Sequence, residues 1–230
     1  LSLTILDADG VPVRGLESDD FEFGGLSSAQ VTGFSDQGDG IYTFQVTNTV
    51  AEAVSVSVEV SGVGLGSFDA VTFTPDAPVA DNTTATVGDG IAGQPTSITI
   101  TVLDAKGNPV AGIAGDLALS VSSGPNQGAS FTAITDNGDG TYTVSYTPTV
   151  AGSDEIAITL DGVAISGSPY TSSVEPGPIS VGADGSELSV DKTSVIANGV
   201  SAATVTLQLR DEYGNAISQE GVEVSFATTH

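Results

Sequence analysis

The stretch Asp136–Gly152, DNGDGTYTVSYTPTVAG, carries the clearest fold signal in the chain because it joins an acidic turn to an alternating strand. Two aspartates and two glycines fall within Asp136–Gly140, and Tyr142, Val144 and Tyr146 then alternate with Thr and Ser. Tight turns use Asp or Asn side chains that bond to their own backbone, and Gly residues that adopt positive φ. Alternation with a period of two indicates a half-buried β-strand.

A closely similar phrase, DQGDGIYTFQVTNTVAE, starts at Asp36, which is 100 residues before Asp136. LDADGVPVRG (Leu6–Gly15) matches LDAKGNPVAG (Leu103–Gly112), and LRDEYGNAIS (Leu209–Ser218) is a third, partial copy. A period of about 100 residues is the size of one β-sandwich domain and is too long for a solenoid repeat. The sequence therefore predicts tandem β-sandwiches.

The second copy is complete and shows short alternating segments separated by turn residues. We expect seven strands in it, at residues 83–87, 97–103, 117–121, 130–135, 142–148, 155–160 and 170–174. Seven such strands in about 100 residues are typical of a two-layer Greek-key sandwich. No segment shows a sustained helical period, so the predicted fold is all-β, with Greek-key β-sandwiches arranged end to end.

The repeat boundaries predict three domains. Residues 1–78 form a domain that lacks its first strand, and residues 79–177 form a complete domain. Residues 178–230 form the N-terminal part of a third domain, which stops after about three strands. Because the chain starts at Leu1 without Met, we expect it to be an excised piece of a longer protein. The incomplete end domains are then either cut by the excision or completed by partner chains.

Two longer stretches resemble known families. Ser186–Thr228 contains DKT followed by ANG, an alternating strand, and DEYGN before VEVSF, and it resembles the opening half of a bacterial Ig-like domain of the intimin/invasin type. Asp136–Tyr170, which ends in GSPY, is similar to the closing half of a filamin-type repeat. Both resemblances imply Ig-like sandwiches. The first also implies the stalk of a bacterial surface adhesin, anchored in the outer membrane through regions outside this chain.

The composition excludes several kinds of partner. The chain has 29 acidic and four basic residues, and its formal net charge is −25. Nucleic acids and anionic membrane surfaces would repel it, because binding to either depends on Lys and Arg. No apolar window of about 18 residues predicts a membrane-spanning helix. Cysteine is absent, so cores, metals or neighbouring chains must hold the domains together.

Catalytic chemistry has few candidate residues. The only histidine is His230, the last residue, so a Ser-His-Asp or Cys-His site is not expected. Zinc sites need clusters of His or Cys, which the chain lacks. Lys106 lies in a predicted turn and Lys192 near a strand start, so a self-formed Lys–Asn bond is not supported either. Paired carboxylates are expected by accident among 29 acids, and we predict that the protein is not an enzyme.

The acidic turns raise the question of a bound cation. Loops after the second, fourth and sixth strands of a sandwich return to the same end, which for the second domain faces the linker Thr74–Asn82. Six aspartates would then surround the joint of the first two domains: Asp76, Asp81, Asp104, Asp136, Asp139 and Asp161. Calcium takes six to eight oxygen ligands, so these residues predict a calcium site that stiffens the joint.

Turn chemistry alone is the competing interpretation of the same residues. The sequence DNGDG lacks the stride of two that an EF-hand loop requires, and Lys106 replaces the second acid of DADG (Asp7–Gly10) in the next copy. Both interpretations stay open at this stage. Tyr42 and Tyr142 occupy equivalent positions after the acidic turns, and we expect each to be structural, with a packed ring and an anchored hydroxyl.

These features together predict a non-enzymatic spacer in a bacterial cell-surface adhesin. It would be a monomeric rod that holds a distal binding tip, with the unknown receptor bound elsewhere in the parent protein. One alternative is a recognition module that binds a glycan or a host protein. Another is a fibre subunit whose incomplete ends are completed by neighbouring copies.

Overall fold

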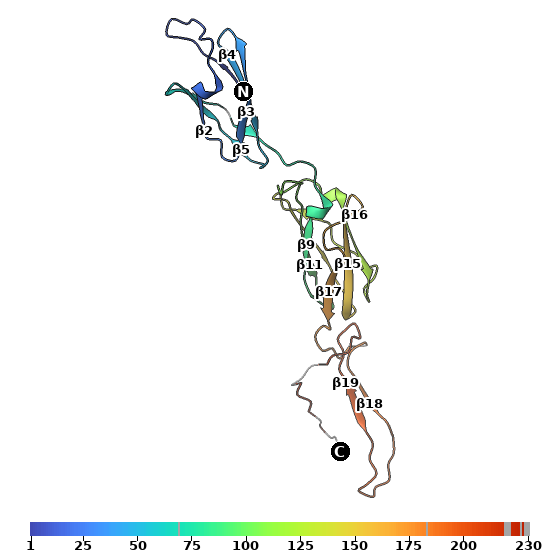
Figure 1. The fold of residues 1–230 in the computed structure, drawn as a ribbon. Coiled ribbons are helices and arrows are strands. Elements are labelled where there is room, and N and C mark those ends of the chain that lie inside the picture. Colours follow the sequence, from blue (N-terminus) through green and yellow to red (C-terminus); the bar gives the residue numbers. More distant parts are fainter. Residues whose placement is uncertain (69, 183, 219–221, 226, 228–230) are drawn as a thin grey trace. The chain divides into compact units, whose positions relative to one another are not determined.

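The computed structural model describes residues 1–68, 70–182, 184–218, 222–225 and 227, and it divides into two compact units. Unit 1 comprises Leu1–Pro78 together with Leu103–Val110. Unit 2 comprises Val79–Val102 and the described residues from Ala111 onward. Strands dominate both units (Figure 1).

Unit 1 contains two three-stranded sheets and one short pair, all antiparallel. Its strands are β1 (Ser2–Thr4), β2 (Phe21–Gly24), β3 (Gln30–Gly38), β4 (Ile41–Thr47), β5 (Ala53–Val54), β6 (Ser57–Val60), β7 (Val63–Ser67) and β8 (Val71–Thr72). The sheet orders are β1-β4-β3, β2-β6-β7 and β5-β8, and the 3₁₀ turn η1 (Ser18–Asp20) precedes β2.

Aromatic side chains fill the core of unit 1. Tyr42 and Phe44 lie two residues apart on β4, so they point to the same face of the sheet, and both are buried. Phe21 on β2 packs against them, with ring centroids 5.2 Å from Tyr42 and 5.0 Å from Phe44. The alternation that predicted a strand here therefore also places these rings between the sheets.

Unit 2 contains a two-layer sandwich. Its strands are β9 (Thr84–Val87), β10 (Gly90–Ile91), β11 (Thr96–Thr101), β12 (Leu117–Ser123), β13 (Thr135–Asp136), β14 (Thr141–Tyr146), β15 (Gly152–Leu160), β16 (Val163–Ala164) and β17 (Tyr170–Glu175). One layer has the order β13-β14-β11-β9, and the other has β10-β17-β15-β12 with β16 paired to β15. The 3₁₀ turns are η2 (Ala80–Asn82) and η3 (Ala114–Asp116). Figure 1 shows β9 beside β11 and β15 beside β17.

The core of this sandwich comes from alternate positions on facing strands. Ile98 and Ile100 on β11 are fully buried, as are Ile156 and Ile158 on β15. The residues between them are less buried, which is the pattern of a strand with one face toward the core. The predicted all-β fold of tandem Greek-key sandwiches is thereby confirmed.

One predicted strand is much shorter than expected. The segment 130–135 contributes only an isolated bridge between Phe131 and Tyr146 and the start of β13. The reason is local, because the amide of Ser145 donates to the side-chain oxygen of Thr132 instead of a backbone carbonyl. The sequence analysis also missed β10, a two-residue strand that pairs in parallel with β17 and is too short to show alternation.

The two units differ in the pairing of one strand, which is β1 in unit 1. In unit 2 the corresponding strand, β11, pairs with β14 on one side and with β9 on the other. In the described part of unit 1, β1 pairs with β4 and no strand lies along its other edge. This is the edge at which the repeat predicts a missing first strand.

The C-terminal segment of unit 2 forms one antiparallel pair, β18 (Glu187–Val190) with β19 (Val205–Gln208). Leu188 and Val205 on this pair are exposed, so its apolar side chains build no core among the described residues. Phe226, the last residue of the VEVSF stretch, and His230, the only histidine of the sequence, lie outside the described residues. Asp211 in the same segment, by contrast, is fully buried.

The core assignment predicts different effects for two Val→Ala substitutions in unit 2. Val144 on β14 is 4% exposed, whereas Val163 on β16 is 59% exposed. Val144→Ala should lower the free energy of unfolding by about 1.5–3 kcal/mol, because it removes buried methyl groups and leaves a cavity. Val163→Ala should change it by less than about 0.5 kcal/mol. Urea unfolding monitored by circular dichroism measures both, and equal effects would contradict the assigned core.

Candidate functional site

Asp211 organises a tight turn in the C-terminal segment of unit 2. Its Oδ1 accepts hydrogen bonds from the backbone amides of Tyr213 at 3.0 Å and Asn215 at 2.8 Å. Its Oδ2 accepts hydrogen bonds from Asn215 Nδ2 and from the Gly177 amide, both at 2.7 Å. Four donors therefore satisfy a carboxylate that is fully buried, which offsets the cost of removing it from water.

Asn215 extends this network to the sandwich of unit 2. Its Nδ2 donates to the carbonyl of Thr149 at 2.8 Å, and its Oδ1 accepts a hydrogen bond from the amide of Ala151 at 2.8 Å. The loop between β14 and β15 is thus bound by a side chain more than 60 residues further along the chain.

Unit 1 contains the same arrangement around Asp104. Oδ1 of Asp104 accepts hydrogen bonds from the amides of Lys106 at 2.8 Å and Asn108 at 2.9 Å. Oδ2 accepts hydrogen bonds from Asn108 Nδ2 at 2.8 Å and from the Asp76 amide at 3.0 Å. Asp76 and Gly177 both directly follow a proline, so the two turns hold equivalent linker positions.

Asn108 then binds the loop between β4 and β5 in unit 1. Its Nδ2 donates to the carbonyl of Thr49 at 2.9 Å, and its Oδ1 accepts a hydrogen bond from the Ala51 amide at 2.8 Å. The sequence Thr-Val-Ala is the same in both loops. We call the two arrangements Asp–Asn turns, defined by Asp104 with Asn108 and by Asp211 with Asn215.

The first copy of the turn lacks the asparagine. Asp7 still closes a turn, because its Oδ1 accepts hydrogen bonds from the amides of Asp9 at 3.0 Å and Val11 at 2.9 Å. Val11 occupies the position of Asn108 and Asn215, and its side chain is exposed. This copy therefore has no side-chain amide at the position that binds a loop.

Hydrogen bonding governs the acidity of the two aspartates. Burial, the largest single influence on Asp211, would raise its pKa, but the bonds from Asn215 and from the Gly177, Asn215 and Tyr213 amides outweigh it and lower the pKa. At Asp104, burial again acts to raise the pKa. The hydrogen bonds, with Asn108 as the main donor, outweigh it and hold the pKa well below its usual value. Both carboxyl groups are therefore ionised at neutral pH.

The six aspartates predicted to bind calcium lie in several local structures. Asp104 accepts the hydrogen bonds described above, and one of their donors is the backbone amide of Asp76, not its carboxylate. Asp136 closes its own turn through the Gly138 amide and also accepts a hydrogen bond from the Gly112 amide at 2.6 Å. The bond from the Gly138 amide is that of a turn, whereas the bonds from the Asp76 and Gly112 amides join a turn to another segment.

The other predicted ligands have separate backbone roles. Oδ1 of Asp139 accepts a hydrogen bond from the Thr141 amide at 3.0 Å. Asp161 adopts a left-handed conformation, with φ of 48°, after β15, and Asp81 lies within η2. Within the described ranges, no group of three or more acidic residues or histidines has the geometry to hold a metal ion. Calcium binding stays a prediction.

The two equivalent tyrosines are structural, as expected. Tyr42 and Tyr142 are fully buried. The Tyr42 hydroxyl donates to the Val13 carbonyl at 3.0 Å and accepts a hydrogen bond from the Leu16 amide at 3.2 Å. The Tyr142 hydroxyl accepts a hydrogen bond from the Ile113 amide at 3.2 Å, and burial raises the pKa of this residue.

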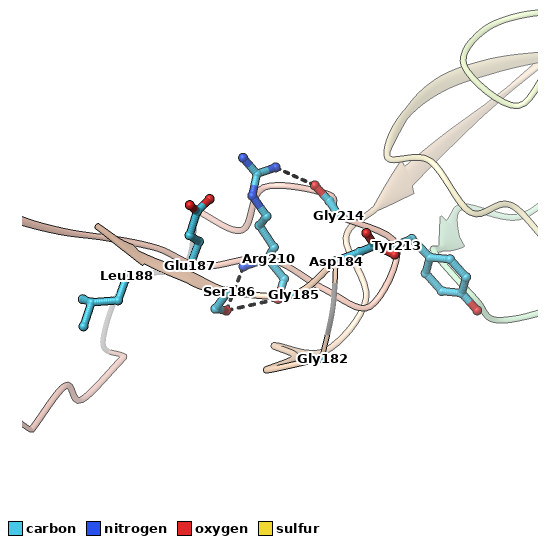
Figure 2. A pocket seen from close by; sticks show the side chains of 9 residues that line it. All are labelled: Gly182, Asp184, Gly185, Ser186, Glu187, Leu188, Arg210, Tyr213 and Gly214. Atoms are coloured by element: carbon cyan, nitrogen blue, oxygen red, sulfur yellow. Dashed lines mark hydrogen bonds between the residues drawn. The ribbon is translucent and has the colours of Figure 1, made fainter. Parts of the chain in front are cut away.

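A surface cavity of about 720 Å³ adjoins the second Asp–Asn turn (Figure 2). It is lined by residues 182 and 184–188 together with Arg210, Tyr213 and Gly214. Arg210 Nη1 donates to the Gly214 carbonyl at 2.7 Å, and the Arg210 amide donates to the Ser186 hydroxyl at 3.0 Å. Figure 2 shows the Tyr213 side chain turned away from Arg210. These polar groups serve the turn itself.

Sequence reasoning missed Asn108 and Asn215 as functional candidates. A signal was present, since Asp and Asn recur four residues apart in LDAKGN and LRDEYGN. The loops that bind them also recur, in TNTVAE and TPTVAG. Nothing in either phrase shows that one binds the other, because the contact joins a side chain to a backbone.

Comparison with protein families confirms both resemblances. Residues 77–171 match the model of the Filamin/ABP280 repeat, and residues 182–230 match the model of invasin domain 3. Each match covers less than half of the chain.

Solved structures of bacterial adhesins have a similar fold. FdeC, an Escherichia coli adhesin, is 26% identical with a TM-score of 0.67 over 90% of this chain and 67% of its own. InvD of Yersinia pseudotuberculosis is 26% identical with a TM-score of 0.62 over 94% of this chain and 66% of its own. Invasin, a bacterial integrin-binding protein, is 23% identical with a TM-score of 0.53, covers 96% of this chain, and shows the fold alone.

The chain thus spans about two thirds of the length of FdeC and InvD and 44% of that of invasin. The described residues contain no helix with the length and apolar character needed to cross a membrane. These findings support an adhesin-related module built from Ig-like sandwiches.

The buried carboxylate of Asp211 predicts a pH-dependent effect of Asp211→Asn. A lowered pKa in the folded state stabilises the fold above the unfolded value of 3.8, and this stabilisation is lost as the pH falls through the lower folded value. The variant should be less stable than the parent at pH 7, and the difference should shrink below about pH 4. Thermal unfolding from pH 7 to pH 2 measures this difference.

Asp184→Asn, which removes one exposed charge in the same segment, is the matched control. It should show a small difference from the parent at every pH. A difference for Asp211→Asn that stays constant down to pH 2 would contradict the assigned role of the carboxylate.

Proposed function

We propose that this chain is a stalk segment of a bacterial cell-surface adhesin, which carries a binding tip away from the surface. The observation that carries the proposal is the similarity to FdeC and InvD over nine tenths or more of the chain. The tip and the membrane anchor would lie in other parts of the parent protein. The receptor would bind at the tip, and the segment would act as a monomer without catalysis.

Sequence and charge suit this role. Tandem domains with independent cores add length with each copy, because no contact with distant copies is needed for folding. The linkers Thr74–Asn82 and Val174–Ser180 contain prolines, which restrict the backbone and limit bending. The net charge of −25 opposes association of neighbouring stalks at short range.

A second candidate, recognition of a ligand by one sandwich, is favoured by an aromatic cavity in unit 1. This cavity of about 320 Å³ is lined by four phenylalanines, Phe21, Phe23, Phe34 and Phe44, with residues of β3. Phe23 and Phe34 are half-buried and would contact a glycan or an apolar side chain, whereas Phe21 and Phe44 belong to the core. A glycan array probed with the chain distinguishes the two functions, since a stalk should show no specific signal.

The stalk proposal predicts an extended monomer in solution. A compact protein of 230 residues would have a radius of gyration of about 17 Å. Small-angle scattering should give a clearly larger value that does not change with protein concentration. A radius near 17 Å would contradict the stalk, and growth with concentration would favour the fibre subunit.

Calcium at the acidic turns would stiffen the stalk, and a thermal unfolding experiment tests this part of the proposal separately. Extracellular calcium sites commonly bind on the order of 10⁻⁴–10⁻³ M, so the comparison uses millimolar calcium against a chelator. A midpoint raised by calcium and lost in a variant with Asp136 and Asp139 changed to Asn would support a site. An unchanged midpoint would leave turn formation as the role of these residues.

A further inference from the structure

Each unit contains a loop with the sequence Thr-Val-Ala that offers the same two backbone groups to an asparagine. In unit 2, Thr149 offers its carbonyl and Ala151 its amide. In unit 1, Thr49 and Ala51 offer the same groups. The four distances lie between 2.8 and 2.9 Å, so the two contacts have the same geometry.

The support beneath the loop differs between the units. In unit 2, Oδ1 of Asn126 accepts hydrogen bonds from the amides of Thr149 at 2.8 Å and Val150 at 2.9 Å. Nδ2 of Asn126 donates to the Val150 carbonyl at 2.7 Å and to the buried carboxylate of Asp154 at 2.8 Å. This loop is therefore fixed from within its own sandwich.

Unit 1 fixes its loop with other residues. The Val50 amide donates to Oδ1 of Asn48 at 3.0 Å, and Nδ2 of Asn48 donates to the Glu52 carboxylate at 2.8 Å. Ser27 and Ser28 also donate to Glu52. The supports thus change from one copy to the next, whereas the outward pair of backbone groups and the asparagine that binds it are the same. The contact itself is the feature that recurs.

The side-chain amide of the asparagine is also oriented by the aspartate of its own turn. One N–H of the Asn215 amide group is directed to Asp211 and the other to Thr149, which leaves Oδ1 for the Ala151 amide. The aspartate therefore sets which way the amide faces. An amide group whose orientation is already fixed loses less conformational entropy when it binds the loop.

We propose that the Asp–Asn turn is a docking element, and that its partner is the Thr-Val-Ala loop of the repeat that precedes it in the chain. The same turn would also hold the linker, because Asp211 and Asp104 accept hydrogen bonds from the amides of Gly177 and Asp76. This proposal rests on the stalk function proposed above. It names the surface through which one repeat recognises the next.

In the first copy, Val11 stands at the position of the docking asparagine. A repeat whose turn carries valine at this position presents an apolar side chain in place of the docking amide. The first copy is then able to receive a docking turn through Thr49–Ala51, but its own Asp7 turn lacks the docking amide. The asparagine at the fourth residue after the aspartate is therefore the specificity determinant.

Amide hydrogen exchange in the full chain tests the docking contact at residue level. Asn215→Ala removes the acceptor of the Ala151 amide, so exchange at Ala151 should become roughly two- to tenfold faster, while Ala51 is unchanged. Asn108→Ala should have the converse effect, faster exchange at Ala51 and no change at Ala151. Each variant thus serves as the control for the other.

Asn198→Ala is a third, matched variant. Asn198 also lies in the C-terminal segment, and its Oδ1 accepts hydrogen bonds from the amides of Val200 and Ser201 within its own turn. Neither Ala51 nor Ala151 should change in this variant. The proposal is overturned if both alanines exchange faster in each docking variant, which would indicate general loosening, or if neither changes.

The exchange measurement is independent of the scattering that tests the stalk. A crossed exchange pattern in a chain that scatters as a compact particle would retain the docking element and reject the stalk. An extended particle without the crossed pattern would reject the docking element and leave the stalk unaffected.

Discussion

A buried carboxylate that accepts hydrogen bonds from four donors is the interaction on which the two Asp–Asn turns depend. Asp104 and Asp211 each receive two amides of their own turn on one oxygen, and a linker amide and an asparagine on the other. An ionised group removed from water without these donors would cost more than the turn gains. The sequence spacing of Asp and Asn is fixed because the side chain must reach around a turn of that length.

The sandwiches supply the rigid frame that this turn needs. Alternating side chains such as Ile156 and Ile158 close the two sheets of unit 2, and aromatic rings around Phe21 do so in unit 1. Strands held by such cores place the loop after β14 and the loop after β4 in defined positions. The loops can then offer backbone groups as a binding surface, even though their own supports, Asn126 and Glu52, are unrelated residues.

Much of this fold is predictable from period-two alternation and from turn residues, as at Asp136–Tyr146. Prediction fails where a strand is short or its ladder is broken. The two residues of β10 show no alternation, and Thr132 substitutes a hydroxyl for a backbone acceptor opposite Ser145. The candidate site was missed for another reason: Asn215 recognises the backbone of Thr149 and Ala151, and nothing in the two recurring phrases shows that one binds the other.

Scalar coupling across hydrogen bonds, observed by NMR on the isotopically labelled full chain, tests the central claim most directly. The backbone nitrogen of Ala151 should couple to the side-chain carbonyl carbon of Asn215, and that of Ala51 to the corresponding carbon of Asn108, because each pair shares a hydrogen bond of 2.8 Å. Both couplings observed in one sample would establish that each turn binds its loop in solution. Their absence, in a sample where the couplings within the β-sheets are resolved, would contradict it.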